Sequence, residues 1–138
     1  MCCWIIIHLT NTCFYTGAVS FYVERRNNQV LSLNEIVRWD GQFIDTDNAF
    51  STISGTFRAP VNGLYFFGVY FRCPINKTLR LALTKNGSTN GSGFARSGTG
   101  SIMAIFKLRT GDKVQVKHTS STIETIIGNH SRFVGFRL

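Results

Sequence analysis

The chain of 138 residues is short of acidic side chains, of proline and of long apolar runs. Two prolines stand against thirteen glycines, so the chain contains neither a collagen-like repeat nor a proline-rich linker. No apolar run reaches the length of a membrane-spanning helix. Hydrophobic residues make up 43% of the chain and aromatic residues 13%, which is enough apolar material for one well-packed domain.

Acidic residues are scarcest in the second half of the chain. The formal net charge is +8, and residues 70–138 hold eleven basic side chains but only two acidic ones, Asp112 and Glu124. This imbalance favours an acidic partner surface, such as a sulfated or sialylated glycan, an anionic lipid or an acidic protein. Ordinary solvated strand faces on a basic protein are the alternative explanation.

Motifs for catalysis and for metal binding are also missing. The sequence has no nucleophile motif, no pair of carboxylates at a useful spacing and no phosphate-binding glycine loop followed by a helix. His118 and His130 have no partner motif, so we expect solvated side chains rather than catalysts or ligands. We therefore expect a protein that is not an enzyme and that needs no cofactor or metal. The aromatic residues lie at core positions of the expected strands, which argues against nucleic-acid binding.

Cysteine is rare and unevenly placed. Cys2, Cys3 and Cys13 lie in the first thirteen residues and Cys73 is alone in the body, so no spacing matches a tetrahedral metal site. Cys73 is most simply a small buried hydrophobe near a strand end, and a disulfide between Cys73 and Cys13 is the open alternative.

The first seventeen residues differ from the rest. Met1 to Leu9 form a short apolar run that His8 interrupts and that no Lys or Arg precedes. A secretory signal has a basic start, an apolar core and a small-residue cleavage site. The segment is therefore interpreted as a weak signal peptide cut near Gly17, a remnant of one, or the product of a start codon upstream of a domain. We expect residues 1–17 to be a leader and residues 18–138 to be the domain.

Four Asn-x-Ser/Thr sequons favour the secretory route and a secreted glycoprotein, since each falls in an expected turn or loop. A single sequon arises easily by chance in a loop rich in Asn and Ser, but four together favour the secretory route. Their asparagines are Asn76, Asn86, Asn90 and Asn129.

After residue 17 the pattern is one of short strands and turns, which is typical of an all-β sandwich. No helical periodicity extends far enough to compete with it. Asn86-Gly87 marks the end of a hairpin, and the glycine-rich stretch from Gly87 to Gly100 predicts a mobile loop. Ten strands are expected: Val19–Arg25, Ile36–Trp39, Gln42–Asp45, Gly55–Arg58, Leu64–Arg72, Thr78–Lys85, Ser101–Leu108, Lys113–Thr119, Thr122–Ile127 and Arg132–Leu138.

The expected strand Leu64–Arg72 is apolar on both faces. An antiparallel strand with one wet face alternates apolar and polar residues, and this one does not. Its second face must therefore be covered by another sheet and loop, or by another subunit. Alternation places Tyr65, Phe67, Val69 and Phe71 on one face and Leu64, Phe66 and Tyr70 on the other.

Basic residues recur at alternating positions on both sides of the turn Thr110-Gly111-Asp112, which is expected to close a hairpin. Across such a hairpin, the basic residues of the two strands would form one positive strip, extended by Arg96 or His118. The candidate ligand-binding residues are Arg96, Lys107, Arg109, Lys113 and Lys117.

Four segments carry a family resemblance. Gly55–Phe67 contains a Gly-x-Phe strand, an Ala-Pro turn and a Gly-x-Tyr-x-Phe strand, and Leu83–Gly87 contains the hairpin after the next strand. Leu108–Val114 contains Leu-x-x-Gly-Asp-x-Val, and Phe133–Leu138 contains a terminal Phe-x-Gly-Phe. Over residues 18–138, in order and spacing, the chain resembles the globular head domain of the complement C1q family. The signature positions are Phe57, Pro60, Gly63, Tyr65, Phe67, Gly111, Asp112, Phe133, Gly135 and Phe136.

The resemblance implies a single-domain, ten-stranded jelly roll, similar to tumour necrosis factor, that assembles as a trimer through one aromatic-rich sheet. It also implies an extracellular, non-enzymatic binding module. Some members bind calcium near the Gly-Asp turn, but Lys113 follows Asp112 here and acids are few, so calcium is not expected. Many relatives carry a collagen-like stem or a coiled coil, which this chain lacks, so we expect a head-only member.

Two functions follow from the resemblance. The first is a secreted, lectin-like recognition protein of innate immunity, a homotrimer or heterotrimer whose basic strip binds anionic glycans, lipids or microbial surface patterns. The second is a trimeric structural or signalling ligand that engages an extracellular protein receptor, with charge incidental. An intracellular adaptor is a third class, which requires a reduced Cys73 and four unmodified sequons.

Overall fold

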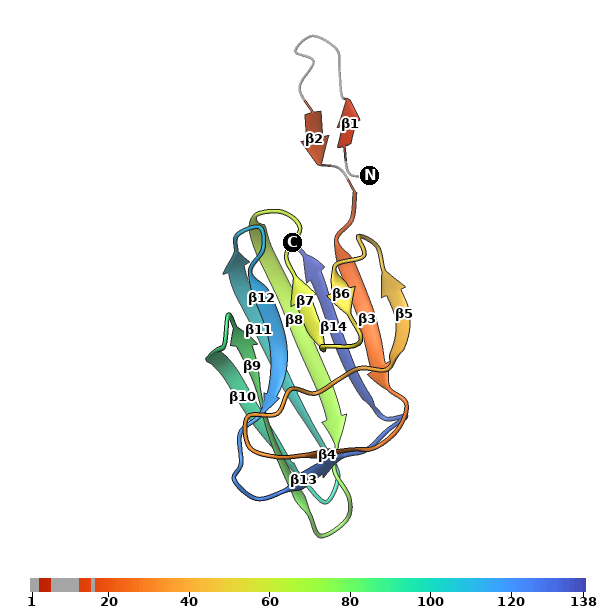
Figure 1. Cartoon of the computed structure of the whole chain (residues 1–138), viewed down its shortest axis with the longest axis vertical. Coiled ribbons are helices and arrows are strands. Elements are labelled where there is room, and N and C mark those ends of the chain that lie inside the picture. Colours follow the sequence, from red (N-terminus) through yellow and green to blue (C-terminus); the bar gives the residue numbers. More distant parts are fainter. Residues whose placement is uncertain (1–2, 6–12, 16) are drawn as a thin grey trace.

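The computed structural model describes residues 3–5, 13–15 and 17–138, and within them the protein consists only of strands, turns and loops (Figure 1). Ten strands form two five-stranded antiparallel sheets that pack face to face as a sandwich. The strand order is β11-β8-β14-β3-β5 in sheet I and β10-β9-β12-β7-β6 in sheet II. The expected all-β jelly-roll sandwich in a single domain is confirmed.

Each sheet combines strands from distant parts of the chain. Sheet I contains β3 (Ser20–Arg25), β5 (Gly41–Asp45), β8 (Gly63–Arg72), β11 (Thr99–Leu108) and β14 (Ser131–Arg137). Sheet II contains β6 (Phe50–Ser51), β7 (Thr56–Arg58), β9 (Thr78–Lys85), β10 (Ser88–Arg96) and β12 (Lys113–His118). Two smaller pairs join β1 (Cys3–Ile5) to β2 (Cys13–Tyr15) and β4 (Gln29–Leu31) to β13 (Glu124–Ile126).

Nine of the ten expected strands are present, with ends shifted by at most two residues. The tenth, Ile36–Trp39, forms only an isolated bridge from Ile36 to Lys117. The hairpin at Asn86-Gly87 is confirmed, and its φ values of 49° and 88° are those of a type I′ turn. The strands β4 and β6 were not expected, because two or three residues are too short to show an alternating pattern.

The glycine-rich stretch from Gly87 to Gly100 is not a loop, so the expectation of a mobile segment there is wrong. It contains β10, which pairs with β9 on either side of a bulge at Asn90. Glycine is required because β10 and β11 approach closely: a Cβ on Gly93 would lie 2.9 Å from the carbonyl oxygen of Ser101. The low apolar content fits an edge strand, which has backbone partners on one side only.

The core between the sheets is a cluster of aromatic rings. Phe21 of β3 stacks on Phe57 of β7 with ring centroids 5.0 Å apart, and it meets Phe133 of β14 edge-on at 4.9 Å. Phe67 of β8 lies 5.6 Å from Phe57. Gly135 pairs with Phe21 and Phe67, and a Cβ there would lie 2.7 Å from Cδ1 of Phe67. Only glycine fits at this point, so the signature Phe-x-Gly-Phe reflects how the two sheets pack.

The N-terminal strands pair only with each other and join neither sheet. Residues 1–2, 6–12 and 16, which include most of the expected leader, lie outside the described residues, so the leader stays a prediction. Cys73 is 2% exposed, as expected for a small buried hydrophobe, and its Sγ donates to the carbonyl oxygen of Lys77 at 3.4 Å. Cys73 is a free thiol in the structure, so the disulfide alternative finds no support.

Candidate functional site

Strand β8 turns alternate side chains to opposite sides of sheet I, as its sequence predicts. The core-facing side chains are at most 2% exposed: Tyr65, Phe67, Val69 and Phe71. On the outer side, Leu64 and Tyr70 are about half exposed. The sandwich therefore covers one apolar side of β8, and the described part of the chain leaves the other open to solvent.

The neighbouring strands extend this outer surface with further apolar side chains. Ile105 of β11 pairs with Phe66 of β8, and Phe66 pairs with Phe136 of β14. Ile105 is 60% exposed and Met103, two residues away on the same strand, is 72% exposed. We call this surface the apolar face: Tyr22, Phe43, Leu64, Phe66, Tyr70, Met103, Ile105, Val134 and Phe136.

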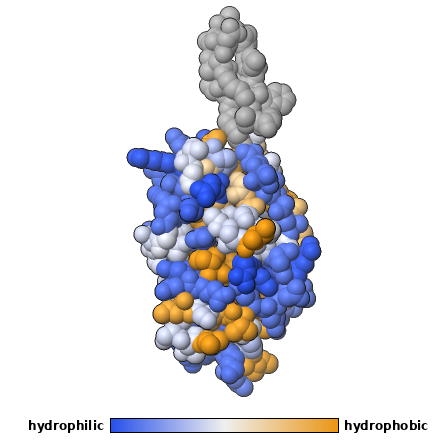
Figure 2. All heavy atoms as spheres, viewed as in Figure 1, coloured by the Kyte–Doolittle hydropathy of each residue, from blue (hydrophilic) through white to orange (hydrophobic). Residues whose placement is uncertain are grey.

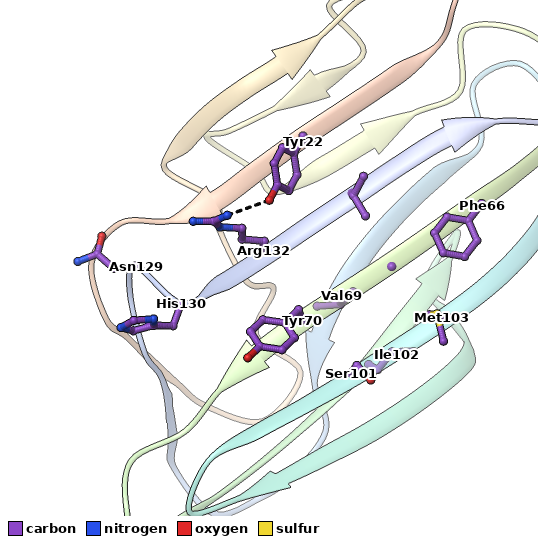
Figure 3. Close-up of a pocket in the computed structure, with 12 residues that line it drawn as sticks. Tyr22, Phe66, Val69, Tyr70, Ser101, Ile102, Met103, Asn129, His130 and Arg132 are labelled. Carbon is purple, nitrogen blue, oxygen red and sulfur yellow. Dashed lines mark hydrogen bonds between the residues drawn. The ribbon is translucent and has the colours of Figure 1, made fainter.

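A hollow of about 500 Å³ opens in the apolar face around Gly68 (Figure 3). Gly68 has no side chain, so a gap remains between Phe66 and Tyr70, its neighbours on the outer side of β8. Arg132 and His130 line the hollow and add polar groups. The result is an apolar recess with a polar rim, a shape that accepts an apolar side chain from another molecule.

Arg132 is held at this rim by aromatic neighbours. Its Nη1 donates to the hydroxyl of Tyr22 at 2.9 Å, and its guanidinium lies 5.5 Å from the ring centre of Phe43. The hydrogen bond with Tyr22 raises the pKa of Arg132. Glu24 lies 3.7 Å from Nη2. Because Arg132 is already paired, it forms part of the rim of the hollow and is not a free site for an anion.

The candidate basic residues do not form one strip, and the expected hairpin around Gly111 is wrong. The turn joins β11 of sheet I to β12 of sheet II, so the two strands that it connects are not paired. Lys107 lies on the outer side of sheet I, and Arg109 follows in the turn. The other three candidates point outward from sheet II: Arg96, Lys113 and Lys117.

Asp112 fixes the turn between the sheets. Its Oδ2 accepts the backbone N–H of Arg109 at 2.8 Å, and its Oδ1 accepts Nδ2 of Asn86 at 3.0 Å. The hydrogen bond from Arg109, followed by that from Asn86, holds the pKa of Asp112 below its ordinary value. Lys85 and Lys107 line the same hollow of about 700 Å³. We call Lys85, Lys107 and Arg109 the end cluster.

The end cluster does not fit the calcium site that some family members have. Calcium needs several oxygen ligands, whereas the one carboxylate here is hydrogen-bonded and lies among cations. In the described residues, no group of three or more His, Cys, Asp or Glu side chains lies close enough together to hold a metal ion.

His118 is fully buried, so the expectation of a solvated side chain is wrong. Its Nδ1 lies 2.8 Å from the carbonyl oxygen of Ser32, and its Nε2 lies 2.9 Å from Oε1 of Glu124. Glu124 also accepts the backbone N–H and the Nη1 of Arg80, at 2.8 and 2.5 Å. The sequence could have predicted this burial, because alternation along β12 places His118 on the same side as the buried Val116. His130 is exposed, as expected.

We expect Glu124→Ala to lower the free energy of unfolding by about 3 kcal/mol, because it leaves the buried imidazole of His118 without its carboxylate partner and removes the acceptor of the backbone N–H of Arg80. Chemical denaturation measures the loss. Glu24→Ala is the control, with an expected loss below about 1 kcal/mol, because its ion pairs are 3.7 Å long and involve exposed arginines. Equal losses in the two variants would contradict the role assigned to Glu124.

All four sequon asparagines are exposed. Asn76, Asn86 and Asn129 have φ values of 63°, 49° and 65° in turns, and Asn90 is the bulge residue of β10. Asn86 also bonds Asp112 through its amide, and Asn129 lines the hollow in the apolar face. Glycosylation at these positions stays a prediction.

Other signature positions shape the turns at one end of the sandwich. The hydroxyl of Tyr65 donates to the carbonyl oxygen of Val61 at 2.7 Å, and burial raises the pKa of Tyr65. Pro60 follows β7 and Gly63 begins β8. Gly111 has a φ of 92°, a conformation that favours glycine. These residues fix the ends of strands rather than contact a ligand.

The sheet order and the aromatic core define an all-β jelly roll of the C1q and tumour necrosis factor type. The family model "C1q domain" matches residues 20–138, so the chain belongs to the C1q domain family. Among curated proteins, no sequence match was found. In the described residues, no helix is long and apolar enough to cross a membrane.

Solved structures share the fold at low sequence identity. The globular domain of zebrafish complement 1qA is 19% identical with a TM-score of 0.74, over 88% of this chain and 98% of the other. Eiger TNF from S. frugiperda is 13% identical with a TM-score of 0.71, over 88% and 92%. Murine APRIL is 12% identical with a TM-score of 0.70, over 88% and 100%.

Proposed function

We propose that this chain is a secreted, non-enzymatic recognition module of innate immunity that forms a trimer and binds anionic glycans, lipids or microbial surface patterns. The observation that carries the proposal is the presence of two unlike surfaces on opposite sides of the sandwich. The outer side of sheet I is apolar and suits self-association, and the outer side of sheet II presents basic residues that suit an anionic ligand.

Self-association is supported by the size and shape of the apolar face. Monomeric soluble proteins rarely expose a contiguous apolar patch of this kind, which spans four strands of sheet I and includes the half-exposed ring of Phe43 on the fifth. Ile105 projects from it at 60% exposure, whereas Met103 lines its recess around Gly68. Heterologous contacts through such a face form a ring when the rotation between subunits closes. We assign the ring three members from the family resemblance.

Recognition of anions is supported by the hydrogen bonds that both acidic side chains of residues 70–138 make within the protein. Glu124 is buried and bonded to Arg80 and His118, and both carboxylate oxygens of Asp112 accept hydrogen bonds, one from Arg109 in its own turn and one from Asn86. Basic side chains of the same half remain exposed, so the field around the domain is positive. In the view of Figure 2, most of the visible surface is hydrophilic, with separate apolar patches.

Binding to a model polyanion tests the proposed ligand class. We expect the protein to bind immobilised dextran sulfate but not uncharged dextran. The affinity should fall at least tenfold between about 0.1 M and about 1 M salt, because the screening length shrinks from about 10 Å to about 3 Å. Surface plasmon resonance measures both quantities. Absence of binding both to dextran sulfate and to phosphatidylserine vesicles would contradict the proposal.

A trimeric structural or signalling ligand for a protein receptor is the second candidate. It is supported by the similar TM-scores to the complement domain and to the two tumour necrosis factor-like structures. This candidate predicts a saturable protein partner, recovered from extracellular fluid at high salt, and no binding to dextran sulfate.

A further inference from the structure

A line of cations crosses the outer side of sheet II diagonally. Arg96 of β10 pairs with Thr78 of β9, and Arg80 lies two residues further along β9. Another two residues along, Ala82 pairs with Lys117 of β12. Each step moves one strand across and two residues along, so successive Cα atoms are about 8 Å apart. The line exists only because the sheet has the order β10-β9-β12 in this register.

Two more cations complete the line at its other end. Lys113 is four residues from Lys117 on β12, which corresponds to about 13 Å, and it pairs with Arg58 of β7. From Arg96 to Arg58 the line spans about 30 Å. We call it the cationic diagonal: Arg96, Arg80, Lys117, Lys113 and Arg58.

The other outward residues around these cations are neutral. Among the described residues that face outward from β7, β9, β10 and β12, none is acidic. Arg80 alone is paired, with the nearly buried Glu124. The neutral outward residues are Thr56, Thr78, Ala82, Thr84, Thr89, Ser92, Phe94 and Gln115.

We propose that the cationic diagonal is the binding track of a linear sulfated polysaccharide. This inference rests on the proposed function and names the site and the class of ligand. A line of separated cations matches a chain with repeated charges, and a guanidinium binds two oxyanion oxygens at once. The amide of Gln115 lies between Lys117 and Lys113, and the exposed hydroxyl of Ser92 lies beside the line, opposite Ala82; both can bond sugar hydroxyls.

The track suits a polysaccharide better than a lipid surface. Phe94, 63% exposed, is the only large apolar side chain among its outward residues, so a bilayer would receive no cluster of apolar groups. The diagonal also lies on the opposite side of the sandwich from the apolar face. A trimer would therefore present three tracks at its outside, and one long polysaccharide chain can bind several of them.

Two triple variants with the same change in charge locate the site. The first is Arg96→Gln/Lys113→Gln/Lys117→Gln, which leaves Arg80 in place because it pairs with buried Glu124. The second removes the end cluster: Lys85→Gln/Lys107→Gln/Arg109→Gln. We expect the first to weaken binding of dextran sulfate at least tenfold and to flatten its salt dependence, and the second to change binding less than threefold. Solution mass and thermal unfolding establish that both variants fold and assemble like the wild type.

The outcomes separate this inference from the proposed function. If the wild type binds dextran sulfate and the two triple variants lose affinity equally, or only the end-cluster variant loses it, the diagonal is overturned and the proposed function stands. If the wild type binds neither dextran sulfate nor phosphatidylserine vesicles, both fail. Phosphatidylserine vesicles are the second probe, and preferential binding of these vesicles through the diagonal would also overturn the polysaccharide assignment.

Discussion

Ile105→Glu is expected to convert the proposed trimer into a monomer of 15.5 kDa. Ile105 is 60% exposed on the outer side of β11, the edge strand of sheet I, where it pairs with Phe66 of β8. In a trimer the substitution would bury three carboxylates without partners, and each costs several kcal/mol. Since about 1.4 kcal/mol is a factor of ten, the dissociation constant should rise by about a hundredfold or more. Sedimentation or light scattering over a dilution series measures the change.

The matched control for this experiment is Ile53→Glu. Ile53 is even more exposed, at 86%, but lies between β6 and β7, away from the apolar face. The same chemical change should therefore leave the trimer intact. A wild-type monomer at all concentrations, or dissociation of both variants alike, would show that the apolar face is not the assembly surface.

The fold could be predicted because its determinants are local in the sequence. Alternation along Leu64–Phe71 correctly assigned every side chain of β8 to the core or the outer side. Asn86-Gly87 specifies its own turn through two positive φ values. The prediction of a loop after Gly87 was wrong. Glycine is needed there because β10 comes close to β11, and a contact between distant strands leaves no local pattern in the sequence.

The basic surface could not be predicted, because it depends on which strands are neighbours. Lys107 and Lys113 are six residues apart, yet the turn at Gly111 sends their strands to different sheets. Arg96 and Lys117 are twenty-one residues apart, yet β9 places them on one side of sheet II. Alternation predicts the side of a strand on which a cation lies, but the order of the strands in the sheet decides which other cations lie beside it.

Phe133→Ala and Phe136→Ala are expected to have opposite consequences, although both belong to one signature motif on β14. Phe133 is fully buried, with its ring 4.9 Å from that of Phe21. Its loss should lower the free energy of unfolding by about 4 kcal/mol, as is typical of a buried Phe cut to Ala. Phe136 is 40% exposed and contacts Phe66 at 5.2 Å on the apolar face. Its loss should cost the isolated domain about 1 kcal/mol.

The effects of the two variants on trimer assembly should be the reverse of their effects on unfolding. Phe136→Ala should weaken the trimer at least tenfold, because it removes a ring from the contact surface, whereas folded Phe133→Ala protein should assemble normally. Unfolding is therefore measured in the Ile105→Glu background, where no trimer adds to the stability of the monomer, and assembly is measured by dilution without that substitution. If Phe136→Ala destabilised the monomer as much as Phe133→Ala and left the trimer unchanged, the outer side of β14 would belong to the fold alone. The expected split instead means that two phenylalanines of one strand have different roles, Phe133 in the core and Phe136 in the subunit contact.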